Sequence, residues 1–192
     1  MPAEVEVVSF NGVYPGTPNP VTSDRYNCSD NIDPNLQYAN QVPGAGLVNR
    51  SWIKHRALHI KGGSFSQLSE WRWGGPGNVK TVWKLGSKGG KIQVALRTSP
   101  TDAGCPLDRY FQATGNSTSG DDIKDVHPYY KGDPLPCGDM DSYDEDNPLA
   151  FDSQVLTTTG YTKMVVTQLV LYDDTEFGEK DIIYEFWKWK EI

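Results

Sequence analysis

The stretches Thr162–Tyr172 (TKMVVTQLVLY) and Asp181–Lys190 (DIIYEFWKWK) decide the fold class of this chain. Both are rich in the β-branched and aromatic residues that favour strands. The segment that joins them, Asp173–Lys180, is polar and contains a glycine, as connections between strands often do. The sequence therefore predicts two strands that pair as an antiparallel hairpin.

Earlier segments alternate apolar and polar residues with the period of two that is typical of strands. They are Val5–Phe10, Ser51–Lys61, Leu68–Trp73, Val79–Leu85 and Lys91–Arg97. The glycine-rich residues 86–90 predict a turn that joins the last two of these strands in a hairpin. No stretch of about eleven or more residues has the apolar spacing of an amphipathic helix. We therefore expect an all-β protein, an antiparallel β-sandwich or jelly roll of about eight strands with long irregular loops.

The chain has 192 residues, a length typical of a single domain. Within it we expect an N-terminal arm over residues 1–20 and a long acidic loop over residues 98–153, where the periodicity is lost. The net charge is −7, and residues 121–152 hold ten acidic residues against two lysines. No basic stripe is present, which argues against direct binding of nucleic acid. No apolar run is long enough to span a membrane and the first residues do not form a secretory signal, so no membrane partner is expected.

The residue types that usually carry catalysis form no known motif in this chain. A G-x-S-x-G nucleophile motif is missing, and Cys28, Cys105 and Cys137 have no C-x-x-C spacing. Cys105 and Cys137 either bridge the long loop or stay reduced. His55 and His59 lie four residues apart on a predicted strand, about 13 Å from each other, which is too far to share one metal ion. We therefore predict that the chain is not an enzyme.

An acidic cluster, DMDSYDED at residues 139–146, is the candidate site for a metal cofactor. The carboxylates of Asp139, Asp141, Asp144 and Asp146 are the hard oxygen ligands that Ca²⁺ prefers. Their spacing departs from that of an EF-hand loop, and the central glycine is missing. A solvated acidic loop without a metal is the alternative interpretation, and it is the one that we favour.

Tryptophan is the strongest local feature, with six in the chain. Trp71 and Trp73 are two residues apart, as are Trp187 and Trp189, so the members of each pair share one face of a strand. Such tryptophans fill a core, stack on sugar rings or form the centre of a protein interface. We predict that most of the six fill the core. The two pairs are the candidates for an interface, Trp187 and Trp189 before Trp71 and Trp73.

Several segments have an order and composition that match a known pattern. They are NRSWIKHRAL at residues 49–58, FSQLSEWRW at 65–73, VTQLVL at 166–171 and IIYEFWKWKE at 182–191. Together with the early strand, they resemble a family of small structural proteins in the virions of tailed bacteriophages and related prokaryotic viruses. The resemblance does not extend to the acidic residues 121–152. It implies a β-sandwich attached to the capsid or tail, and it carries over no catalytic residues.

The resemblance also implies partners and a location. The protein would bind the major capsid protein or other virion subunits, form a homo-oligomer, and assemble into the virion in the host cytoplasm. The leading hypothesis is a non-enzymatic capsid decoration protein, which stabilises the particle through subunit contacts. A carbohydrate-binding module or surface adhesin that uses exposed tryptophans is the alternative. A hydrolase with its acids at residues 139–146 is the least supported hypothesis.

Overall fold

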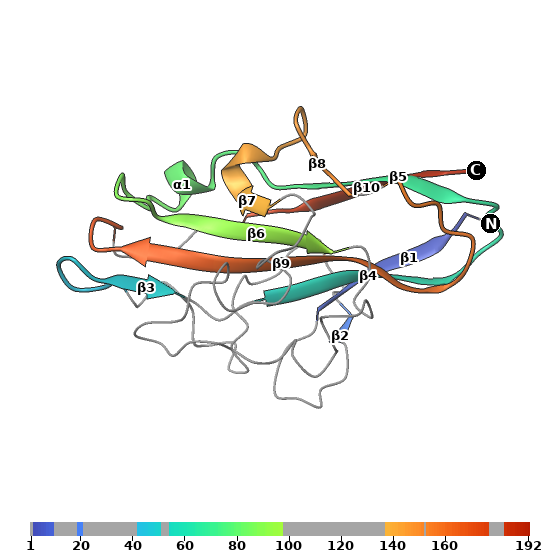
Figure 1. Ribbon diagram of the computed structural model, residues 1–192, viewed down its shortest axis with the longest axis horizontal. Helices are drawn as coiled ribbons and strands as arrows, with labels where there is room; N and C mark the ends of the chain where they lie inside the picture. The colour runs from blue at the N-terminus through green and yellow to red at the C-terminus, as the bar shows by residue number, and fades with distance from the viewer. Residues whose placement is uncertain are drawn as a thin grey trace.

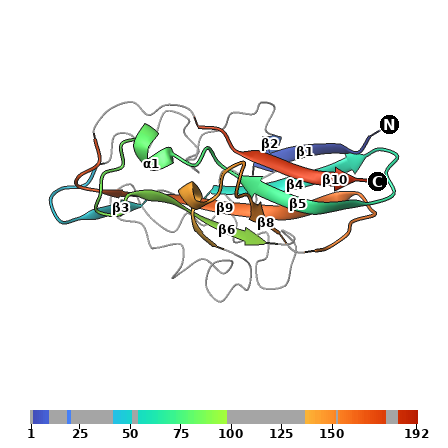
Figure 2. The ribbon, with the colours of Figure 1, turned by 90° about the horizontal axis from the view of Figure 1, so that it is seen from above.

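The strands of the chain form two sheets that lie one over the other (Figures 1 and 2). The computed structural model describes residues 2–9, 19–20, 42–50, 54–97, 137–151, 153–176 and 183–192. Within these residues one sheet has seven strands and the other has three. The all-β prediction is confirmed, whereas the jelly-roll order and the number of about eight strands are not.

The large sheet has the order β2-β1-β4-β9-β6-β7, and β3 also pairs with β9. The small sheet has the order β10-β5-β8. The strand bounds are β1 Glu4–Ser9, β2 Asn19–Pro20, β3 Val48–Arg50, β4 Lys54–Gly62, β5 Leu68–Gly74, β6 Lys91–Arg97, β7 Cys137–Asp139, β8 Leu149–Ala150, β9 Gly160–Tyr172 and β10 Phe186–Glu191. Two short helical turns accompany them, α1 at Val79–Val82 and the 3₁₀ turn η3 at Met140–Ser142.

Strand β9 is the centre of the large sheet. It pairs antiparallel with β4 and β3 on one side and with β6 on the other. Side chains on both of its faces are buried, among them Val165 and Val166, which explains why its sequence is a nearly continuous apolar run. A bulge at Lys163 interrupts the pairing with β4, and this residue has a φ of 45°.

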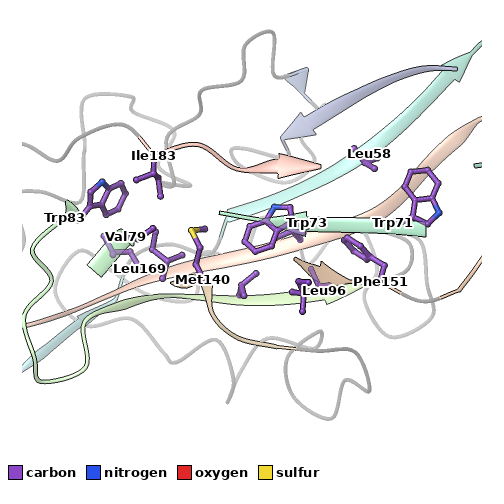
Figure 3. Packing of buried hydrophobic residues seen from close by; sticks show 14 of the residues in the cluster. Leu58, Trp71, Trp73, Val79, Trp83, Leu96, Met140, Phe151, Leu169 and Ile183 are labelled. Carbon is purple, nitrogen blue, oxygen red and sulfur yellow. The ribbon is translucent and has the colours of Figure 1, made fainter. Parts of the chain in front are cut away.

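The hydrophobic core fills the space between the two sheets (Figure 3). The small sheet contributes Trp71 and Trp73 of β5, and the large sheet contributes residues such as Leu58, Leu96 and Leu169. These five side chains are at most 1% exposed. Burial of large side chains from both sheets is what holds the layers together.

The prediction of a strand over Val79–Leu85 is wrong. Residues 79–82 form α1, because the Asp141 carboxylate accepts hydrogen bonds from the backbone N–H groups of Val79 (2.6 Å) and Lys80 (2.9 Å). The helical turn then directs Val79, Trp83 and Leu85 into the core. Residues 86–89 do form a turn, but the hairpin predicted around it is also wrong, since only β6 follows it as a strand.

The prediction that the last two strands pair with each other is wrong as well. Strand β9 belongs to the large sheet, whereas β10 pairs antiparallel with β5 in the small one, with Trp187 opposite Trp73. The final strand begins at Phe186 rather than at residue 181. The chain therefore changes sheets after β9, and its last residues cover the core from the other side.

The predicted long loop at residues 98–153 is described only from residue 137, apart from residue 152. This part contains β7, η3 and β8, so short elements do occur within the expected loop. Residues 98–136, and residues 1 and 10–18 of the predicted N-terminal arm, lie outside the described residues. No helix in the described part of the chain has the length and apolar character needed to cross a bilayer.

Candidate functional site

A buried ion pair connects the two sheets. The Arg56 guanidinium on β4 donates to both oxygens of the Glu185 carboxylate, Nε to Oε1 at 2.9 Å and Nη2 to Oε2 at 3.1 Å. The two side chains are 0% and 3% exposed. Arg56 Nη1 also donates to the Thr167 hydroxyl on β9 at 3.0 Å. Glu185 directly precedes β10, so this pair attaches the C-terminal strand to the large sheet.

Two indole N–H groups complete the surroundings of Glu185. Trp73 Nε1 donates to Oε2 at 2.8 Å, and Trp187 Nε1 donates to Oε1 at 3.2 Å. With the two bonds from Arg56, the carboxylate accepts as many hydrogen bonds as its oxygens readily take. We call the set of Arg56, Thr167, Glu185, Trp73 and Trp187 the inter-sheet network. Because its donors and acceptors satisfy one another, its chemistry is that of a structural cross-link between layers.

The four candidate interface tryptophans differ in exposure. Trp71 and Trp73 are 0% exposed and offer no surface to a partner, so we carry the interface prediction forward only for the other pair. Trp189 lies against Trp71 with ring centroids 6.1 Å apart, and Trp187 stacks on Phe151 at 5.9 Å. Both are partly buried against the core. Among the described residues no tryptophan is exposed as an open platform, so no observation favours the sugar-stacking alternative.

The outward side of β10 is charged. Lys188 and Lys190 are exposed and pair with Glu145 and Glu70, each at 3.1 Å. The Lys188 ammonium also lies 4.7 Å from the centre of the Phe186 ring. Exposed pairs of this kind contribute little to stability. Their charges do discourage nonspecific pairing at the edge of the small sheet, where β10 lies.

The carboxylates proposed as calcium ligands bind groups of the chain itself. Asp139 accepts from the backbone N–H of Asp141 at 3.1 Å and pairs with Lys80 at 2.6 Å, and this hydrogen bond raises the pKa of Lys80. Asp144 accepts from the backbone N–H groups of Asp146 at 3.0 Å and of Asn147 at 2.9 Å. These contacts organise a loop whose local order the sequence did not indicate.

Nowhere in the described residues do three or more His, Cys, Asp or Glu side chains gather as metal ligands would. The Ca²⁺ site at Asp139, Asp141, Asp144 and Asp146 therefore stays a prediction. His59 contacts Glu6 at 3.1 Å and stacks on Tyr161 at 4.2 Å, as a residue on a half-exposed strand face does. Cys28, Cys105 and His127 lie outside the described residues, as do the side chains of His55 and Cys137.

A second polar contact joins three turns at one end of the large sheet. The Asp174 carboxylate accepts from the backbone N–H groups of Ser87 (2.6 Å) and Lys88 (3.0 Å). Asp173 accepts from the Lys88 ammonium at 2.6 Å and from the backbone N–H of Gly46 at 2.8 Å. The Lys88 hydrogen bond and that of Gly46 lower the pKa of Asp173. For Asp174, burial acts in the opposite direction, but the hydrogen bonds outweigh it and its pKa is also lowered.

Sequence reasoning missed the inter-sheet network, although a signal for it exists. Arg56 shares its strand face with Leu58 and Ile60, and Glu185 has the same parity as Trp187 and Trp189. A charge beside inward-facing apolar residues, matched by the opposite charge in another strand, indicates a buried ion pair.

Comparison of the chain with protein-family models, with curated proteins and with solved structures finds no match.

Proposed function

We propose that this chain is a non-enzymatic structural subunit of a virion, a capsid decoration protein that stabilises the particle by binding the major capsid protein or other virion subunits. The proposal starts from the resemblance of residues 49–58, 65–73, 166–171 and 182–191 to small virion proteins. Those segments include parts of β3, β4, β5, β9 and β10.

The composition of the inter-sheet network is the observation that supports the proposal most. Each of the four segments contributes to the inter-sheet network: Arg56 comes from the first, Trp73 from the second, Thr167 from the third, and Glu185 with Trp187 from the fourth. These residues thus have a structural task, which is to hold two sheets in one arrangement. A catalytic site would instead bring acids, bases or nucleophiles to an open site.

The physics of this arrangement suits a subunit that binds neighbours. A decoration protein gains its effect from many symmetric contacts, each of which requires a surface that keeps its shape. A sandwich whose layers are joined by burial and by a satisfied ion pair meets that requirement. Trp187 and Trp189, half-buried beside the edge of the small sheet, are the first residues to examine for contact with a neighbour.

The test is to locate the chain in its native assembly. We expect immunogold labelling and electron microscopy of particles from the source culture to reveal many copies in a symmetric array. Particles stripped of the chain should release their genome at a lower temperature, and adding back the purified chain should restore the original temperature. Heat-unfolded chain is the control. A chain that stays monomeric and is absent from every particle and filament would overturn the proposal.

A further inference from the structure

Three turns meet at one end of the large sheet (Figures 1 and 2). They span residues 44–47 before β3, residues 86–89 before β6 and residues 173–175 after β9, and we call the first of them the β3 turn. The other two are joined by bonds to backbone carbonyls. The Thr175 hydroxyl donates to the carbonyl of Leu85 at 3.1 Å. The Glu176 N–H donates to the carbonyl of Lys84 at 3.0 Å. Because neither a hydroxyl nor a backbone amide titrates in acid, these two bonds do not depend on pH.

The β3 turn is attached through a carboxylate instead. Its Gly46 N–H donates to Oδ2 of Asp173 at 2.8 Å, and Oδ1 of the same carboxylate accepts from the Lys88 ammonium at 2.6 Å. The Asp173 side chain is only 12% exposed. Every residue of the β3 turn is exposed, and none of them belongs to the hydrophobic core. The carboxylate of Asp173 therefore holds a turn that has no side chain in the core.

We propose that Asp173 forms an acid-sensitive contact, so that protonation of its carboxylate frees the β3 turn while both sheets stay folded. The hydrogen bond from Lys88 and that from Gly46 lower the pKa of Asp173 below its ordinary value of 3.8. The contact with Asp173 in turn raises the pKa of Lys88, which keeps its charge in acid. Because the carboxyl pKa is lowered, the contact stabilises the turn fully above pH 3.8 and is lost as the pH falls through the lowered value. These contacts lie apart from the inter-sheet network, so the proposal goes beyond the proposed function and does not depend on it.

The other charged groups near Asp173 already have partners. Asp174, on the same turn, accepts from two backbone N–H groups of the turn at residues 86–89. Glu176 pairs with Lys84 at 2.6 Å. The β3 turn, with the sequence Gly-Ala-Gly-Leu, contributes no titratable side chain. Acid also weakens the Asp174 contacts, but the two bonds to backbone carbonyls still join those turns. Opening in acid is therefore confined to the β3 turn.

The experiment follows backbone amides of the full chain by NMR as the pH is lowered from neutral. The Gly46 amide proton reports on the contact directly, because it is hydrogen-bonded to the carboxylate. We expect its chemical shift to titrate with a midpoint below 3.8 and its protection from hydrogen exchange to fall roughly tenfold. Amides of β9, such as that of Val165, should stay protected over the same range. In D173N, the Gly46 shift should not titrate.

Two further variants make the test specific. K88M removes the hydrogen bond that contributes most to the lowered pKa of Asp173, so the midpoint at Gly46 should rise toward 3.8. D174N leaves Asp173 and both of its donors in place, so Gly46 should titrate as in the wild type. Protected β9 amides at neutral pH show that each variant is folded. A midpoint unchanged in K88M, a titration that persists in D173N, or a loss of Gly46 protection only together with β9 would overturn the proposal.

Discussion

Arg56 and Glu185 are 129 residues apart in the sequence, and they form a doubly hydrogen-bonded ion pair between the two sheets. Both side chains are almost completely shielded from water. Removal of one member of such a pair destabilises the folded state strongly, because the remaining charge loses its partner in a medium of low polarity. This relationship joins the last strand of the chain to the first long strand of the large sheet.

Removal of either partner should therefore destabilise the protein strongly. We expect E185Q or R56Q alone to lower the free energy of unfolding by about 3–5 kcal/mol. Replacing both residues with apolar ones, as in R56M/E185L, should recover much of that loss because no buried charge remains. Urea unfolding curves measure the difference. Losses below about 1 kcal/mol for both single variants would mean that the pair is solvated in solution.

The two buried tryptophans of β5 should respond differently to the loss of the indole N–H. Trp73 Nε1 donates to the Glu185 carboxylate at 2.8 Å, whereas Trp71 Nε1 donates to the backbone carbonyl of Gln154 at 3.3 Å. Both changes to phenylalanine remove similar volume, so W73F should be more destabilising than W71F by about 1 kcal/mol. Thermal unfolding of the two variants side by side measures this, and an equal loss would contradict it.

Two glycines with positive φ differ in what surrounds them. Gly86 (φ 80°) lies against the Asp174 carboxylate, and a Cβ at that position would overlap it. Gly46 (φ 74°) has nothing within 4 Å of such a Cβ. We expect G86A to lower stability by about 2–4 kcal/mol and G46A by about 1–2 kcal/mol. The same loss in both variants would show that backbone conformation alone matters at these turns.

The lowered carboxyl pKa values predict a loss of stability in acid. The pKa of Glu6 is lowered: burial raises it, but hydrogen bonds from His59 and Lys61 outweigh that effect. The pKa values of Asp173 and Asp174 are lowered as well. Groups of this kind stabilise the fold above their ordinary pKa values, 4.5 for Glu6 and 3.8 for the aspartates, and the stabilisation is lost as pH falls through the lowered values.

The Asp174 contribution can be separated from the rest with D174N. The amide of D174N keeps an oxygen that can accept from Ser87 and Lys88, but this oxygen is neutral and does not titrate. Because a neutral oxygen is a weaker acceptor than a carboxylate, D174N should be less stable than the wild type at neutral pH. The difference should shrink as pH falls below about 3.8. Unfolding midpoints measured from pH 7 to pH 2 check this, and a difference that stays constant over that range would contradict it.

Asp141 should matter more to stability than its neighbour Asp146. Its carboxylate binds the first backbone N–H groups of α1, those of Val79 and Lys80, whereas Asp146 is exposed. D141A should therefore cost about 1–2 kcal/mol, and D146A should stay within about 0.5 kcal/mol of the wild type. Chemical unfolding of both variants is the measurement. Equal effects would mean that the capping contact is not formed in solution.

Much of the fold could be predicted from local patterns, and the errors have identifiable causes. The strands β1, β5, β6 and β9 follow from alternation or from apolar runs, which are properties of each segment by itself. Val79–Leu85 has the same pattern, but a carboxylate more than sixty residues away binds its N-terminal N–H groups and favours a helical turn. Of the inter-sheet network, only the tryptophans were predicted as site residues. The pairing of Arg56 with Glu185 could not be predicted, because it depends on which strands pack against each other.

The amino-acid sequence by itself determined that this protein is all-β, where its principal strands lie and which residues are apolar enough for the core, because each of these depends on neighbours a few positions away. Only the tertiary structure decided that the last strand pairs with β5 rather than β9, and that Arg56 meets Glu185. Those choices depend on burial and hydrogen bonding between residues more than one hundred positions apart, which no local pattern contains.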